Sequence, residues 1–159
     1  MTGPIFRDMT PDECEALLSV NHVGRLAFTF KDRVDIQPIH YVFDNGWIFG
    51  RTAEGAKFTT LTHHPFVAFE VDEVHGLFDW RSVVAHGTVY LLDKESGPVQ
   101  ASEYDRALDM MRRFLPETFT SEDPTPFRTI VFGIQVMEMT GREAREGKRR
   151  RSATKRRTK

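Results

Sequence analysis

The stretch GRLAFTFKDRVDIQPIHYVFDNGWIFGRT, residues 24–52, decides the fold. Three runs of alternating apolar residues stand within it, at residues 24–30, 34–43 and 47–52. This period of two is typical of β-strands. Between the last two runs lies Asp44-Asn45-Gly46, whose asparagine and glycine tolerate the positive φ of a tight hairpin. The stretch therefore predicts a meander of three antiparallel strands.

The flanking segments extend this meander into a mainly β protein with helices. Thr10-Pro11-Asp12-Glu13 is a capping box with proline at the first helical position, which predicts a helix over residues 11–20. Two further helices and three further strands are expected, at residues 56–63 and 99–115 and at residues 66–74, 80–92 and 127–138. Six strands, three helices and the lack of repeats favour a small antiparallel barrel decorated by helices.

Composition indicates one ordinary globular domain in a reducing compartment. The chain has 159 residues, of which 40% are hydrophobic and 28% charged. A single cysteine, Cys14, cannot form an internal disulfide, so a cytoplasmic location is expected. The longest charge-free apolar stretch, residues 129–137, is too short to span a membrane, and no basic-then-apolar leader opens the chain. Because the chain has only one cysteine, redox chemistry would need a cofactor.

The charge is divided unevenly along the chain. Residues 141–159 carry ten cationic and two acidic side chains, so this segment contributes +8 and the remainder −9. Its near lack of apolar residues predicts a basic, disordered tail after a folded domain of residues 1–140. The preferred interpretation is a solubilising extension. The alternative is a weak, nonspecific contact of residues 142–159 with nucleic-acid phosphates.

The segment from Gly50 to Lys57 is a candidate phosphate site. It leaves a predicted strand, turns at Gly55 and enters a helix, which brings an arginine, a hydroxyl, backbone N–H groups and a lysine together. It is not a nucleotide-triphosphate P-loop, because Ala56 separates the glycine from the lysine and Phe58 stands where a hydroxyl should follow. A polar turn with two solvated cations is the alternative interpretation.

The histidines do not predict a metal site. His63 and His64 are adjacent on a predicted helix, so their side chains diverge by about 100° and cannot bind one ion together. His40 and His86 lie on predicted strands, where each could pack structurally or donate a proton or hydrogen bond to a ligand.

Five blocks of sequence, in this order, resemble the pyridoxamine 5'-phosphate oxidase-like, FMN-binding split-barrel family. The blocks are Val23–Ala27, Pro38–Val42, Arg51–Lys57, Val67–Asp72 and Trp80–Val84. The likeness is strongest to the small actinobacterial and nitroimidazole-resistance-type branch. It implies an antiparallel six-stranded split β-barrel that forms a homodimer and binds FMN at the dimer interface.

The resemblance also implies the roles of particular residues. The phosphate would be held by Arg51, Thr52 and Lys57, and Ser82 would offer a polar side chain to the flavin. The isoalloxazine ring would lie along the second predicted strand, at Gln37, Pro38, Ile39 and His40. Such a protein would pass hydride or electrons between a nicotinamide nucleotide and a small organic acceptor; the resemblance assigns no catalytic residue.

Two departures from the family's motifs argue against two of its known activities, vitamin B6 oxidation and nitroimidazole resistance. Ala56 removes a phosphate donor found in the vitamin B6 oxidases, whose arginine-rich second strand and C-terminal substrate motif are also missing. Gly50 stands where nitroimidazole-resistance proteins have a histidine. Three alternatives stay open on the same fold: a deazaflavin-dependent reductase, a heme protein, and a non-catalytic flavin- or heme-binding module tethered to nucleic acid by its tail.

Overall fold

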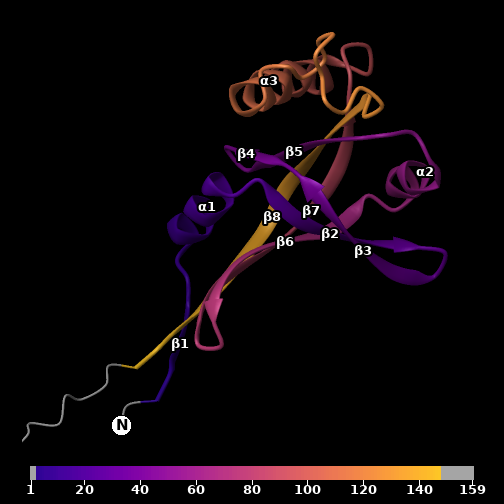
Figure 1. Cartoon of the computed structure of the whole chain (residues 1–159). Helices are drawn as coiled ribbons and strands as arrows, with labels where there is room; N and C mark the ends of the chain where they lie inside the picture. The colour runs from indigo at the N-terminus through magenta and orange to yellow at the C-terminus, as the bar shows by residue number, and fades with distance from the viewer. Residues whose placement is uncertain (1–2, 148–159) are drawn as a thin grey trace, which may run out of the picture.

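The computed structural model describes residues 3–147, without the side chains of residues 56–58. Figure 1 shows helices set around one long, bent sheet. The helices are α1 Pro11–Val20, α2 Ala56–His63 and α3 Pro98–Phe114. The strands are β1 Ile5–Asp8, β2 Val23–Phe30, β3 Arg33–His40, β4 Val42–Asp44, β5 Trp47–Thr52, β6 Phe66–Gly76, β7 Asp79–Leu92 and β8 Ile130–Arg145.

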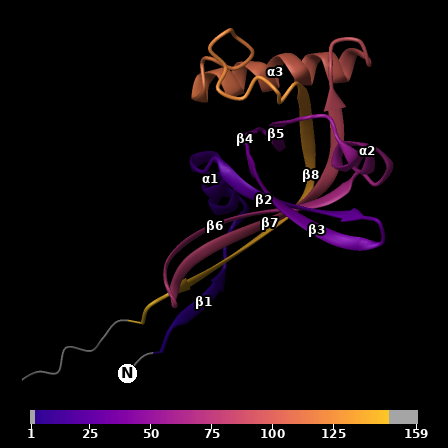
Figure 2. The ribbon, with the colours of Figure 1, turned by 45° about the vertical axis from the view of Figure 1, so that its right-hand side comes forward.

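The sheet is antiparallel and open at one place. Its strand order is β3-β2-β6-β7-β8-β5-β4, and β1 adds to β8. The two ends of this path, β3 and β4, are consecutive along the chain and are joined by Tyr41 alone. The sheet therefore curls back on itself without pairing these two edges, which confirms the predicted split barrel (Figure 2).

The prediction of six strands is wrong, because the described chain contains eight. β1 was missed: four residues give little periodicity, and their pairing partner in β8 lies far away in sequence. The predicted strand over residues 34–43 is broken at Tyr41 into β3 and β4. Tyr41 is buried there, and its hydroxyl donates to the carbonyl oxygen of Leu18 at 2.6 Å, which anchors the split to α1.

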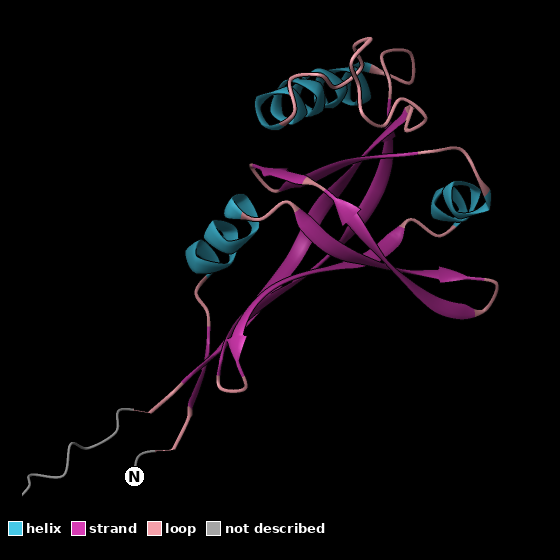
Figure 3. Ribbon diagram, viewed as in Figure 1, coloured by secondary structure: helices cyan, strands magenta, loops and turns pink. Residues whose placement is uncertain are grey.

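The core consists of two apolar clusters. The larger fills the barrel around Phe69 and receives Leu17 and Leu18 from α1. The smaller lies between β5 and α3 and contains Phe49 and Met111. α3 therefore covers the end of the barrel near the split, as Figure 3 shows. None of the described helices is long and apolar enough to cross a lipid bilayer.

The predicted domain boundary after residue 140 is wrong. β8 continues to Arg145 and pairs with both β1 and β7, so residues 141–145 belong to the sheet. Within this extension Gly141 packs closely on α1, since a Cβ on Gly141 would lie 2.5 Å from the sulfur of Cys14. The eight cations from Lys148 onward lie outside the described residues. The tail and its nucleic-acid contact stay predictions.

An ion network ties β1 to α1 and β8. The Arg7 guanidinium binds both carboxylate oxygens of Glu13, at 2.8 and 2.9 Å, and also bonds to the buried Glu143. Glu13 accepts a further hydrogen bond from the backbone N–H of Thr10, which confirms the predicted capping box. These bonds, the one from Arg7 above all, lower the pKa of Glu13 from 4.5 to about 2.

This network predicts a specific acid sensitivity. Because the pKa of Glu13 is lower in the folded chain, its stabilising effect is complete above pH 4.5 and is lost as the pH falls toward 2. We expect Glu13→Gln to be less stable than the wild type at pH 7 and to lose less stability between pH 5 and pH 2. Urea unfolding at several pH values measures this. Parallel stability curves for the two proteins would contradict the role of Glu13.

Candidate functional site

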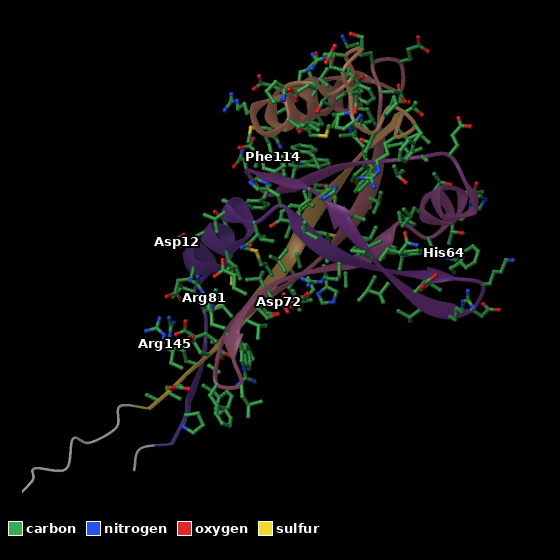
Figure 4. All side chains as sticks on the ribbon, viewed as in Figure 1. Asp12, His64, Asp72, Arg81, Phe114 and Arg145 are labelled. Atoms are coloured by element: carbon green, nitrogen blue, oxygen red, sulfur yellow. The ribbon has the colours of Figure 1, made fainter. Side chains whose placement is uncertain are left out.

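A cavity of about 320 Å³ opens at the split of the barrel, beneath the C-terminal end of α3. Its walls are mainly apolar and come from the β3–β4 junction, β5 and the end of α3. The apolar lining residues are Tyr41, Val42, Phe49, Met111, Phe114 and Leu115. Figure 4 shows Phe114 between α3 and the sheet, and its ring stacks on His22 with centroids 3.9 Å apart. The volume is at the lower end for small-molecule sites.

The end of β3 approaches β5 closely at this cavity. A Cβ on Gly50 would lie 3.2 Å from the carbonyl oxygen of His40 and 2.6 Å from the ring of Phe132. Only glycine therefore fits here without displacing β3 or the ring. The histidine of nitroimidazole-resistance proteins, missing here at residue 50, would not fit this arrangement.

Polar groups gather on one side of the cavity, at His40, Arg51, Thr125 and Arg128. An Arg128 nitrogen lies 3.3 Å from Nδ1 of His40. Because a guanidinium can only donate, Nδ1 accepts in this contact, so the ring proton lies on Nε2. In this contact His40 is left with Nε2 as its hydrogen-bond donor.

Arg51 does not fit the phosphate role predicted for it. Its guanidinium forms a two-point ion pair with Asp123, at 2.7 and 3.2 Å, and also donates to Thr125. The Arg51 and Asp123 side chains are only 8% and 2% exposed. The hydrogen bonds from Arg51 hold the pKa of Asp123 well below its usual range; burial acts in the opposite direction, and the backbone N–H groups of Phe119 and Thr125 add to the lowering. The charge of Arg51 is thus already matched by an ionised carboxylate.

Strand geometry further separates Arg51 from Thr52. Successive side chains of a strand point to opposite faces, so Arg51 lies with Phe49 on the α3 side and Thr52 on the other side. The expected convergence of both side chains on one phosphate is therefore not seen.

The start of α2 retains the features of an anion site. Its first intrahelical bond runs from the N–H of Thr59 to the carbonyl oxygen of Gly55, at 3.3 Å. The N–H groups that precede it in the first turn have no intrahelical acceptor, and Gly55 provides no side-chain cap. Thr52 lies just before this turn. The side chain of Lys57 lies outside the described residues, so its role stays a prediction.

The predicted ring-binding strand is an edge of the sheet. β3 pairs with β2 on one side and begins the strand path, so its other side presents backbone groups to a ligand. Side chains alternate along it: Gln37 and Ile39 are half-buried, whereas Pro38 and His40 are exposed on the outer face. An unpaired strand edge fits the hydrogen-bonding rim of a flat heterocycle.

Ser82 lies on the same outer face but not beside His40. Two strands, β2 and β6, separate β7 from β3, which places Ser82 about 14 Å from the edge strand at the usual strand spacing. Its hydroxyl donates to Glu70 at 2.9 Å, beside the ion pair of Arg25 with Asp72, also at 2.9 Å. Within one chain, Ser82 and β3 therefore do not form one compact site.

The sequence analysis missed Asp123, Thr125 and Arg128. They lie on the connection between α3 and β8, whose composition is that of an ordinary polar loop. Only the fold brings this loop over β5, so no local pattern pointed to Asp123 as the partner of Arg51.

Comparison with known proteins identifies the family. A family model described as pyridoxamine 5'-phosphate oxidase matches residues 10–143, most of the chain. The chain belongs to this family, which confirms the resemblance found in the sequence. An uncharacterised protein from Rhizobium meliloti is 26% identical over 91 residues, which is 57% of this chain. The chain matches about 60% of the length of that curated relative.

Two solved structures are similar over nearly their whole length. A FAD-binding protein from Mesorhizobium loti superimposes with a TM-score of 0.70 at 23% identity, covering 89% of this chain and 99% of that one. The FAD-binding protein from Mycobacterium smegmatis has a TM-score of 0.59 at 25% identity, covering 86% of this chain and 99% of that one. These matches agree with the split-barrel fold.

Proposed function

We propose that the chain is a flavin-binding oxidoreductase that uses FMN. The observation that carries the proposal is that the fold offers both an open edge of β3, with backbone groups for a ring, and an uncapped start of α2, with N–H groups for a phosphate. Family membership and the flavin binding named for two similar structures support it.

The chain's own residues would hold the cofactor at two ends. Thr52, the first turn of α2 and Lys57 would bind the phosphate, without Arg51. Gln37, Pro38, Ile39 and His40 would lie along the ring, with backbone groups of β3 setting its orientation. In the proposed site His40 holds a proton at Nε2, and α3 covers the adjacent cavity.

A bound flavin would supply the redox chemistry, taking hydride from a nicotinamide nucleotide and passing electrons to a small organic acceptor. The protein's contribution is orientation, hydrogen bonding and access. None of the described groups at the site needs to change oxidation state.

The proposal includes a homodimer. The outer face of the sheet carries apolar side chains in solvent, with Val34 78%, Phe66 73% and Met137 71% exposed. These three side chains line one surface hollow of about 400 Å³. Contiguous exposed apolar surface of this kind marks an interaction site, and a second copy would cover it. We expect a solution mass of twice the 18.3 kDa of one chain.

Turnover tests the function. The full chain, loaded with FMN, is mixed with NADH or NADPH and an artificial electron acceptor, and loss of reduced nicotinamide is recorded. We expect catalytic oxidation that requires both the protein and FMN. Flavin binding without any oxidation would show a binding module instead of an enzyme.

A further inference from the structure

We propose that the cavity beneath α3 binds a small organic monocarboxylate, with its apolar body between the sheet and α3 and its carboxylate at Arg128 and His40. That this ligand is the substrate rests on the proposed flavin function, whereas its binding does not. The resemblance assigns two of the lining residues, His40 and Arg51, to the flavin, and it assigns no carboxylate to the cavity.

The volume and the apolar walls of the cavity indicate the size and the apolar character of the ligand. Phe49 and Met111 belong to the smaller core cluster, so the inner end of the cavity is continuous with dry, packed protein. At about 320 Å³ the space suits a single ring or a short branched chain and is too small for a dinucleotide. An apolar group gains free energy by leaving water for this surface.

The charge at the polar side of the cavity indicates which head group the ligand carries. Arg51 is neutralised by Asp123, as described above. Arg128 differs: among the described residues it forms no ion pair, and its side-chain contacts are with His40 and the ring of Phe127. One guanidinium thus remains unmatched on the rim of an apolar cavity, which complements a single negative charge.

His40 makes this site selective for an acceptor. Its contact with Arg128 leaves Nε2 as a donor, so both side chains offer hydrogen and neither offers a free lone pair to the ligand. A carboxylate accepts from both, whereas a primary amide presents one oxygen and two N–H donors that find no acceptor on these two side chains. Arg128 itself is positioned by its loop, because its carbonyl oxygen accepts from Arg51 at 3.4 Å.

The test compares an acid with its amide on flavin-free protein. Phenylacetate and phenylacetamide have the same ring and differ in the head group, and calorimetric titration gives the dissociation constant of each. Wild type is compared with Arg128→Gln and with Arg113→Gln. Arg113 is the matched control, since it carries the same charge on α3 but pairs with the exposed Asp109 at 2.8 Å.

We expect saturable phenylacetate binding, with phenylacetamide at least tenfold weaker. Arg128→Gln should weaken phenylacetate binding about ten- to hundredfold, as expected for a charge-assisted hydrogen bond, while Arg113→Gln leaves it unchanged. The acid–amide comparison needs no variant, so it holds even if Arg128→Gln disturbs the loop.

The proposal would be overturned by a lack of saturable phenylacetate binding, by equal affinity for acid and amide, or by equal losses in the two arginine variants. Displacement of phenylacetate by FMN would also overturn it, because the cavity would then belong to the flavin. Failure of nicotinamide turnover with phenylacetate binding intact would refute the oxidoreductase function alone.

Discussion

Replacing Asp123 with asparagine is expected to lower the free energy of unfolding by about 3–5 kcal/mol, because it leaves the buried Arg51 charge without its counter-charge. The carboxylate also accepts from the backbone N–H groups of Phe119 and Thr125, at 2.8 and 2.9 Å. A single side chain thus fixes the loop that borders the cavity. Urea unfolding followed by circular dichroism measures the change.

Two further variants separate the buried pair from general charge effects. Removing both charges in Arg51→Met/Asp123→Leu should restore part of the lost stability, since no uncompensated charge stays buried. Asp109→Asn is the surface control: it breaks an exposed pair with Arg113 and should cost less than about 1 kcal/mol. A loss for Asp123→Asn as small as that of the control would show that the buried pair does not hold the loop.

Replacing Lys57 with alanine is expected to weaken FMN binding by about 1.5–3 kcal/mol, or roughly ten- to hundredfold, as expected for a charge-assisted hydrogen bond to phosphate. The effect should be large because Arg51 is already paired with Asp123. Lys57 is therefore the cation of the predicted phosphate segment that is left to bind the phosphate. Equilibrium titration of FMN fluorescence gives the dissociation constant.

Lys94→Ala is the matched control for this experiment. This substitution removes the same charge from an exposed position between β7 and α3, where Lys94 lies 3.6 Å from Asp105. Its loss should leave FMN affinity unchanged. Equal affinities of the wild type and Lys57→Ala would remove the lysine from the phosphate site.

Local patterns in the sequence were sufficient for most of the fold. The capping box at Thr10 and the Asn45-Gly46 turn encode their own geometry, and the predicted helix over residues 11–20 and strand over residues 47–52 are confirmed without a shift. The errors concern long-range pairing. β1 and the end of β8 stabilise each other, and neither is recognisable before the other is in place.

Only part of the candidate site could be predicted, because the rest of it also depends on long-range contacts. His40 and Arg51 do line one cavity, although β3 and β5 do not pair, because the curled sheet brings the end of β3 against β5. Whether Arg51 can bind a phosphate depends on Asp123, which is 72 residues away and reaches Arg51 only through the packing of the loop after α3. Residue type alone could not distinguish a phosphate-binding arginine from one held in a buried ion pair.

The most direct test of the central claim is to compare the affinities of the full chain for FMN and for riboflavin. The two share the isoalloxazine ring and differ by the phosphate that the start of α2 and Thr52 are proposed to hold. We predict saturable FMN binding and riboflavin binding that is at least tenfold weaker. Equal affinities would contradict the phosphate site, and a lack of saturable binding by either would contradict the flavin function itself.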